Sequence, residues 1–203
     1  MLKYYVYISD TKVNMLYSQI PAKFLEKVQG DVRLNFGFLS GTLKKEKKSE
    51  ENDVIKKLGS VNNYILQHES VGTVENPLNY ISGRLRLKYG IVSEYASDIA
   101  FFGGEINGKL IGLIGATRSL LGEPKNSESN HAPYYYTLEF LNGLIKMNEK
   151  SGESPPFYNY DEAIKIAIET INDSPHSLEF LAKVLHHDEN FVLATPIYVS
   201  ISE

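Results

Sequence analysis

Ser9, Asp10 and Lys12 place a hydroxyl, a carboxylate and an ammonium within one short segment. They follow an alternating apolar run, so we expect them at the carboxyl end of a strand, where a loop leaves such groups accessible to a ligand. An Asp–Lys pair also supports acid–base catalysis when burial shifts either pKa. The alternative is a structural turn, in which Asp10 accepts hydrogen bonds from nearby backbone amides and Lys12 is solvated.

A row of cations follows the spacing of a strand, because Arg84, Arg86 and Lys88 alternate with apolar residues. In a strand this spacing puts all three cations on one face, together with Tyr80. Such a face suits the recognition of phosphate or carboxylate groups. The alternative is the solvent side of a half-buried antiparallel strand, where basic residues are ordinary.

Arg118 follows a glycine-rich segment that contains Gly103-Gly104, Gly112 and Gly115. Glycines allow a backbone to approach a ligand closely, and a guanidinium beside them suits an anion. The segment has neither the lysine of a P-loop nor the GxGxxG of a dinucleotide site. Glycines in adjoining strands also serve bulges and packing contacts, which is the alternative interpretation.

Tyrosine is the other abundant side chain with binding chemistry, since the chain has 14 tyrosines and no tryptophan. Stacking of a nucleobase on a tyrosine ring contributes about 1–3 kcal/mol per base. Tyrosine also favours strands for packing reasons alone, and we expect packing to explain most of these residues.

Most other chemistry finds no support in the sequence. The absence of cysteine excludes thiol nucleophiles, disulfides and thiolate metal sites. The five histidines are scattered, and neither an HExxH motif nor a GxSxG elbow is present. We therefore predict no catalytic residue, no metal site and no cofactor, although a triad assembled from distant residues stays open.

The strands that must position these groups are indicated by alternating apolar residues. Asn107-Gly108 predicts a tight hairpin, because both residues tolerate the positive φ of a type I′ turn. Pro196 suits an edge strand or a bulge. The expected strands span about residues 2–8, 32–38, 80–89, 99–106, 109–116 and 191–201.

Helices are indicated by apolar residues spaced three and four apart. Ser174 as a cap, with Pro175 in the first turn, predicts a helix that buries Leu178, Leu181 and Leu185. The expected helices span about residues 21–29, 54–68, 138–151, 160–172 and 174–185.

The order of elements predicts the fold class. Three consecutive central strands have no helix between them, which argues against parallel βαβ units. We expect one α+β domain over residues 1–203, with an antiparallel or mixed sheet of about six strands and helices packed mainly on one face. The formal charge of −4 and the lack of a signal peptide or long apolar run predict a cytoplasmic protein that binds neither duplex nucleic acid nor membrane.

Four segments resemble a family of uncharacterised bacterial proteins of similar length. They are ISDTKVNMLYSQIP (8–21), VGTVENPLNYISG (71–83), FFGG with GLIGATRSLLG in the central hairpin, and LATPIYVSIS (193–202). The resemblance spans nearly the whole chain and implies no activity. The type of family suggests a bacterial stress or antiviral defence pathway.

Three functions stay open at this point. The first is a non-enzymatic module that binds a small anionic or nucleotide-like ligand, or a protein partner. The second is a phosphodiester-directed hydrolase or nuclease that uses Asp10 and Lys12, and the third is an oligomeric interaction subunit. We favour the first, and its expected ligand-binding residues are Ser9, Asp10, Lys12, Tyr80, Arg84 and Arg118.

Overall fold

The computed structural model describes residues 3–26, 50–92, 98–122 and 160–202. They belong to two compact units, one made of residues 1–9 and 71–203 and the other of residues 10–70. The second unit is an insertion in the first, so the chain leaves the first unit after residue 9 and returns to it at residue 71. The expectation of one domain stays a prediction.

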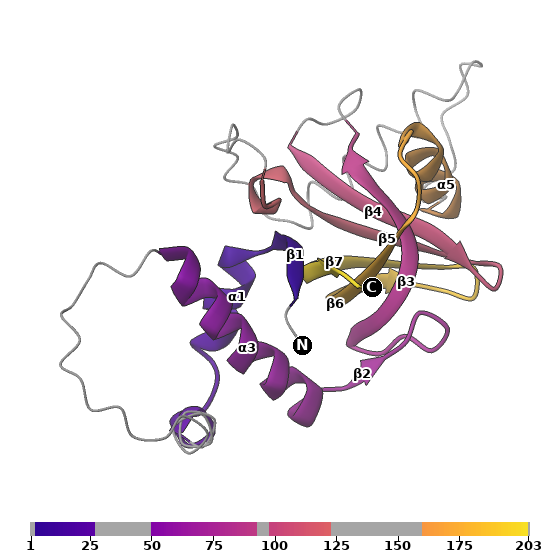
Figure 1. The fold of residues 1–203 in the computed structure, drawn as a ribbon. Coiled ribbons are helices and arrows are strands. Elements are labelled where there is room, and N and C mark those ends of the chain that lie inside the picture. The colour runs from indigo at the N-terminus through magenta and orange to yellow at the C-terminus, as the bar shows by residue number, and fades with distance from the viewer. Residues whose placement is uncertain (1–2, 27–49, 93–97, 123–159, 203) are drawn as a thin grey trace. The chain divides into compact units, whose positions relative to one another are not determined.

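The larger unit is a seven-stranded mixed sheet, five strands of which close into a barrel (Figure 1). Around the barrel the order is β3, β4, β5, β7 and β6, and β6 returns to pair with β3. Only the β5–β7 pair within the barrel is parallel. The barrel strands are β3 (Tyr80–Ile91), β4 (Ile99–Ile106), β5 (Lys109–Ala116), β6 (His176–His187) and β7 (Phe191–Ile201).

Two further strands extend the sheet outside the closed barrel. β1 (Tyr4–Ile8) pairs antiparallel with the carboxyl half of β7, and the two-residue β2 (Val71–Gly72) pairs parallel with the start of β3. One edge of β7 is therefore shared, first by β5 and then by β1. Pro196 lies between the part of β7 that pairs with β5 and the part that pairs with β1. The pairing of β7 with β6 shifts register beside Pro196, which confirms the predicted bulge.

The central hairpin matches its sequence prediction residue by residue. β4 and β5 have the predicted bounds, and Asn107 and Gly108 between them have φ values of 52° and 80°. Both values lie in the left-handed region that a type I′ turn requires. A short 3₁₀ turn, Thr117–Ser119, follows β5 and carries Arg118.

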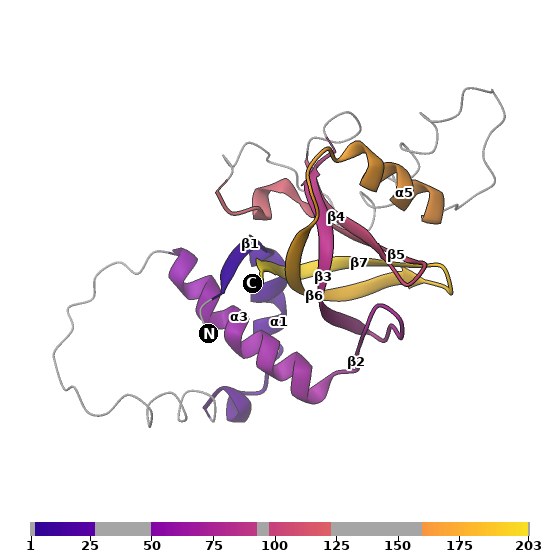
Figure 2. The same ribbon diagram turned by 45° about the vertical axis from the view of Figure 1, so that its right-hand side comes forward.

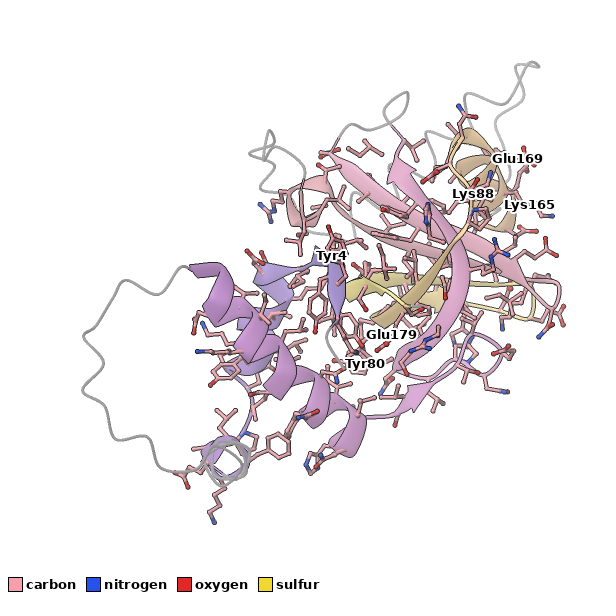
Figure 3. The ribbon with its side chains drawn as sticks, viewed as in Figure 1. Tyr4, Tyr80, Lys88, Lys165, Glu169 and Glu179 are labelled. Atoms are coloured by element: carbon pink, nitrogen blue, oxygen red, sulfur yellow. The ribbon has the colours of Figure 1, made fainter. Side chains whose placement is uncertain are left out.

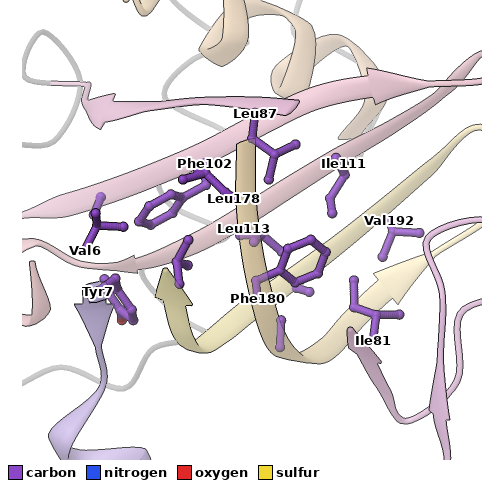
Figure 4. Packing of buried hydrophobic residues seen from close by; sticks show 14 of the residues in the cluster. Val6, Tyr7, Ile81, Leu87, Phe102, Ile111, Leu113, Leu178, Phe180 and Val192 are labelled. Atoms are coloured by element: carbon purple, nitrogen blue, oxygen red, sulfur yellow. The ribbon is translucent and has the colours of Figure 1, made fainter. Parts of the chain in front are cut away.

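The main core fills the inside of the barrel (Figure 4). Outside the bulges of β6 and β7, every second residue of a strand points inward, as the period of a strand requires. Tyr7 of β1 adds its ring to this core and packs edge-to-face on Phe102, with ring centroids 5.7 Å apart. The fully buried side chains that dominate this core are Ile81, Leu87, Phe102, Ile111, Leu113, Leu178, Phe180 and Val192.

A second core lies on the outside of the barrel, where α5 (Tyr160–Thr170) covers β4 and β5 (Figure 2). Ala163, Ile164 and Ala167 of α5 are fully buried there, against the outward side chain of Phe101. Gly103 explains the close approach, because a Cβ at this position would lie 2.8 Å from Ile168 Cγ1. The glycines of the hairpin therefore serve packing, as the alternative sequence interpretation held.

Residues 176–187 correct the sequence analysis, because the helix predicted from Ser174 is strand β6. The helical interpretation relied on Leu178, Leu181 and Leu185, but the inward residues of the strand are Leu178, Phe180, Ala182 and Val184. The apolar residues of this segment fit the period of a helix and also that of a strand. Pairing with β3 and β7 on either side decides in favour of the strand, since it closes the barrel.

The smaller unit is helical over its described residues. α1 (Asp10–Tyr17) and α3 (Glu50–His68) pack together, and Val13, Leu58, Val61 and Ile65 are buried. The predicted helix at residues 54–68 is confirmed, and residues 22–26 form the described part of the one at 21–29. The strand predicted at 32–38 and the helix at 138–151 lie outside the described residues.

The α+β class is confirmed, with a mixed sheet of seven strands where about six were expected. The sheet closes into a barrel instead of lying open beneath helices. The helix predicted at 160–172 is confirmed as α5. None of the described helices is long and apolar enough to cross a membrane.

Candidate anion-binding face

The outward side chains of β3 and β6 form one continuous polar surface of the barrel. The strands pair so that Tyr80 lies opposite Lys183, and Arg84 lies opposite Glu179. The next outward residue of β3 is Arg86. We call the basic face the surface that is formed by Lys3, Arg84, Arg86, Glu179 and Lys183.

Charge is the distinguishing property of the basic face. It holds four cations and one carboxylate, an excess of three positive charges, on a chain whose formal net charge is −4. The side chain of Arg84 is 55% exposed, whereas that of Glu179 is 26% exposed. Arg86 is exposed as well and donates a hydrogen bond from Nη2 to the Pro175 carbonyl at 3.4 Å. The guanidinium groups are therefore accessible to solvent.

Glu179 lies at the centre of the contacts on this face. Its Oε1 accepts hydrogen bonds from Lys3 Nζ and from the Tyr198 hydroxyl, the latter at 3.0 Å. Its Oε2 faces Arg84 Nη2 at 3.8 Å. Partial burial acts to raise the pKa of Glu179, but the hydrogen bonds from Lys3 and Tyr198 and the nearby positive charges outweigh it, so the pKa is lowered. The carboxyl group is therefore ionised at neutral pH.

Tyrosine rings lie among these charges. Lys183 Nζ lies 4.6 Å from the centroid of the Tyr80 ring, and Lys3 Nζ lies 5.0 Å from that of Tyr198. These distances are typical of cation–π contacts. Burial and the adjacent Glu179 carboxylate raise the pKa of Tyr198, so its hydroxyl stays protonated and donates to Glu179. Figure 3 shows Tyr80 and Glu179 near the same end of β3.

Lys88 belongs to the same row in sequence but has a different role. Its Nζ donates to the carbonyls of Ile168 and Ile171, at 3.2 Å and 3.0 Å, at the carboxyl end of α5. A cation at this end of a helix satisfies carbonyls that have no partner within the helix and complements the helix dipole. Figure 3 places Lys88 beside Lys165 and Glu169 of α5, away from Glu179.

Ser9 and Arg118 meet at a different place, around the hydroxyl of Tyr7. The side chains of Ser9 and Ser119 and the backbone of Ala116 bond to this phenol, and the charge of Arg118 acts on it. Burial outweighs these contacts and raises the pKa of Tyr7. Ser9 is itself buried, with its amide donating to the Ile197 carbonyl at 2.9 Å, whereas Arg118 is exposed.

Asp10 and Lys12 belong to the smaller unit, where they lie in the first turn of α1. We expected a loop here from the sequence, but helix α1 begins at Asp10, two residues after the end of β1. Residues two apart on a helix do not face each other. Asp10 is exposed, whereas burial lowers the pKa of Lys12 to about 8.

The structure thus assigns the expected ligand-binding residues to three places. Tyr80 and Arg84 lie on β3 at the basic face, Ser9 and Arg118 lie near Tyr7, and Asp10 and Lys12 lie in α1. Sequence reasoning missed Lys3, Glu179 and Tyr198. The signal that identifies Glu179 is the alternation in β6, which the helical interpretation obscured. Among the described residues, no three His, Asp or Glu side chains are grouped so that they would hold a metal ion.

The chain belongs to a family of unknown function (DUF7019), whose sequence model matches residues 3–203. This match confirms the resemblance noted in the sequence, over nearly the whole chain. No curated protein and no solved structure is significantly similar to the chain. The family brings no activity with it, so a functional proposal has to rest on the residues described above.

Proposed function

We propose that the chain is a non-enzymatic module that binds a small anionic or nucleotide-like ligand at the basic face. The observation that supports this proposal most is the excess of cations on the basic face, two of which, Arg84 and Arg86, are exposed to solvent. A cluster of like charge on an otherwise acidic protein raises the local concentration of anions. Guanidinium groups add directional hydrogen bonds to phosphate or carboxylate oxygens.

The aromatic rings of the face supply the second part of a nucleotide site. Tyr80 lies beneath Lys183, and Tyr5 packs edge-to-face on Tyr198 with ring centroids 5.7 Å apart. An aromatic ring next to a cation suits a ligand that combines a planar base with a phosphate. Tyr80 is only 8% exposed, so a base would stack at the rim of the face and not over the whole ring.

The connectivity of the barrel suggests a second possible binding surface, but in this chain a helix covers it. A closed five-stranded barrel with this strand order, and with a helix before its fourth strand, has the connectivity of the OB fold, which binds oligonucleotides on the face of its second and third strands. The corresponding strands here are β4 and β5, and α5 covers their outer face. Likeness of fold alone does not assign function, and in this chain the equivalent face is occupied.

The alternatives receive less support from the geometry. A hydrolase that uses Asp10 with Lys12 needs both side chains on one substrate, and their positions on α1 turn them in different directions. An oligomeric interaction subunit stays a hypothesis, which light scattering over a range of concentrations would test. A role in a bacterial stress or antiviral defence pathway also stays a prediction.

A ligand screen with charge variants tests the proposal. The full chain is titrated with phosphate, nucleotides and cyclic dinucleotides, and thermal unfolding is recorded. A ligand present at about 100 times its Kd adds about 2.7 kcal/mol to the stability of the folded state. We expect such a shift for wild type and its loss in the double variant Arg84→Gln/Arg86→Gln.

Lys56→Gln/Lys165→Gln is the matched control, because it removes the same charge from two exposed lysines that do not belong to the basic face. It is expected to respond like wild type. The proposal is wrong if no anion in the panel stabilises the protein, or if the arginine variant responds as strongly as the control.

A further inference from the structure

We infer that the ligand of the basic face carries two separated phosphate groups joined through a nucleoside, and that Arg84 and Arg86 each bind one of them. This inference rests on the proposed function and deepens it, because it names the class of ligand. A cyclic dinucleotide and a short single strand of nucleic acid share this chemistry, and titrations with both distinguish them.

The spacing of the two arginines is set by the sheet. Arg84 and Arg86 lie on the same side of β3, two residues apart. A strand rises about 3.3 Å per residue, so their Cα atoms are about 6.6 Å apart along the strand. β6 runs antiparallel to β3, and its residues opposite the two arginines are Glu179 and Ser177. The two side chains therefore start from successive levels of one sheet.

The contacts of the two guanidinium groups increase this separation. Arg84 Nη2 lies 3.8 Å from Glu179 Oε2, so this group stays at the level of its own residue. Arg86 Nη2 donates to the Pro175 carbonyl at 3.4 Å, and Pro175 directly precedes β6. Because Pro175 follows Ser177 in the direction away from Glu179, Arg86 leans away from Arg84. The two guanidinium groups thus diverge along the sheet instead of converging on one point.

Both groups present their charge to solvent from these positions. The side chain of Arg84 is 55% exposed, and Arg86 is exposed as well. An anion can therefore reach either group without displacing a buried side chain. Arg86 is bonded to a neutral carbonyl, whereas Arg84 lies beside the carboxylate of Glu179. We therefore expect Arg86 to be the stronger of the two anchors.

A single phosphate group does not match this arrangement. Its oxygens lie close together and suit donors that converge, whereas here each guanidinium suits an oxyanion of its own. A nucleoside esterified at both its 3′ and its 5′ oxygen holds two phosphates apart by the width of its sugar. The two groups of a 5′-diphosphate share a bridging oxygen and stay together. The Tyr80 ring beside Lys183 favours a nucleoside as the spacer, because a base can stack at the rim of the face.

Two isomeric ligands test the spacing directly. Thymidine 3′,5′-bisphosphate and thymidine 5′-diphosphate contain the same atoms and the same number of phosphates, and they differ in how far apart the phosphates lie. Calorimetric titration of the full chain at about pH 5 also matches their charge, because the second pKa of a phosphate ester is about 6. We expect wild type to bind the bisphosphate about tenfold more tightly than the diphosphate, a difference of about 1.4 kcal/mol.

Single arginine variants separate the two anchors. Arg84→Gln and Arg86→Gln each remove one anchor, so each is expected to reduce the preference for the bisphosphate to less than about twofold, or about 0.4 kcal/mol. Lys56→Gln, at an exposed lysine that does not belong to the basic face, is the matched control and should keep the preference. Inorganic phosphate needs only one anchor, so its binding should fall more in Arg86→Gln than in Arg84→Gln. Thermal unfolding without ligand checks that the variants are folded.

The outcomes separate this inference from the function on which it rests. Equal affinity of wild type for the two isomers, or a preference that both arginine variants keep, would overturn the assignment of two anchors while an anion-binding face remains. If inorganic phosphate, the bisphosphate and the diphosphate all fail to bind, the proposed function fails together with the inference.

Two larger ligands distinguish the sources of the shared chemistry. A cyclic dinucleotide and a thymidylate strand of about eight nucleotides are titrated against the same variants. Tighter binding of the cyclic dinucleotide assigns the face to a small nucleotide. Tighter binding of the strand, with log K falling against log salt by about 0.7 for each phosphate contacted, assigns it to single-stranded nucleic acid. In both cases the loss of either arginine should weaken binding about tenfold, and affinities unchanged in both variants would contradict the inference.

Discussion

Two parts of the outer surface of the barrel, formed by neighbouring strands, have opposite chemistry. On β4 and β5 the outward residues are apolar or glycine except for the exposed Glu105 near the hairpin turn, and α5 packs against the apolar ones. On β3 and β6 the outward residues include Arg84, Arg86, Glu179 and Lys183, and the two arginines are exposed. The first surface is a second core, and the second carries charges that are exposed to solvent.

The difference follows from the pattern of each strand. β4 and β5 are apolar on both faces, so their outer face needs a covering layer to remain out of water. β3 alternates between apolar and polar residues, so its outer face is stable in water without a cover. The helix therefore covers the strands that are apolar on both sides, and the alternating strands keep a polar outer face.

The largest effect on stability is expected from a substitution in the face that α5 covers. Phe101→Ala removes a fully buried ring between β4 and α5, and we expect the free energy of unfolding to fall by about 3–5 kcal/mol. Tyr4→Ala removes an aromatic ring that is 72% exposed and should change it by less than about 0.5 kcal/mol. Urea denaturation of both variants gives the comparison, and equal effects would show that α5 does not seal this face.

Glycine substitutions sharpen the distinction between packed and open positions. At Gly115 an added Cβ would lie 2.6 Å from Tyr7 Cζ, so Gly115→Ala is expected to destabilise by about 1–3 kcal/mol. At Gly59, within α3, an added Cβ meets nothing within 4 Å, so Gly59→Ala should stabilise by about 0.5–1 kcal/mol. Chemical denaturation reports both, and a tolerated alanine at Gly115 would contradict the described packing of Tyr7.

The row of cations on β3 divides into a structural and an accessible part. Lys88→Met removes two hydrogen bonds to the end of α5 and should cost about 1 kcal/mol of stability. Arg86→Met, made on the same strand at an exposed position, is expected to cost less than about 0.5 kcal/mol and to weaken anion binding. Thermal unfolding and phosphate titration of both variants distinguish the two roles. A large loss of stability in Arg86→Met, or a loss of anion binding in Lys88→Met alone, would contradict the assigned roles.

The smallest effect concerns pH. The pKa of Glu179 is lowered in the folded protein, so its stabilising contribution is present above the unfolded value of 4.5 and is lost as pH falls through the folded value. Wild type should exceed Glu179→Gln in stability by about 1 kcal/mol or less at pH 7, because the pair with Lys3 is partly exposed. This gap should close as the pH falls from about 5.5, one unit above the unfolded pKa, through the lowered pKa of the folded state. A gap that widens on acidification, measured by urea denaturation across that range, would contradict the assigned contacts.

Local patterns predicted those parts of the fold that depend on neighbouring residues. The Asn107-Gly108 hairpin and α5 were found in this way, since turn chemistry and helical spacing are local properties. β6 was not predicted, because its apolar residues fit two periods. Leu178, Leu181 and Leu185 have the spacing of a helix, whereas Leu178, Phe180 and Ala182 have that of a strand. Only pairing with β3 and β7, which are distant in sequence, decides between them.

The candidate site shows the same limit. Tyr80 and Arg84 were predicted because their alternation along β3 is visible in the sequence. Glu179 lies on β6, whose register against β3 follows from closure of the barrel, and Lys3 directly precedes β1, which pairs with β7. No local pattern specifies either pairing. Asp10 and Lys12 were expected in a loop, but helix α1 begins there. The two side chains are therefore close in sequence but point in different directions.

The most direct test of the account is to map anion binding on the backbone. Amide resonances of the full chain are followed by NMR during titration with phosphate or a nucleotide. We predict that the largest shifts fall in β3 and β6, around Arg84 and Glu179, while the amides of β4 and β5 beneath α5 stay unchanged. Shifts concentrated on β4 and β5, with none around Glu179, would contradict the assignment of the basic face as the binding surface.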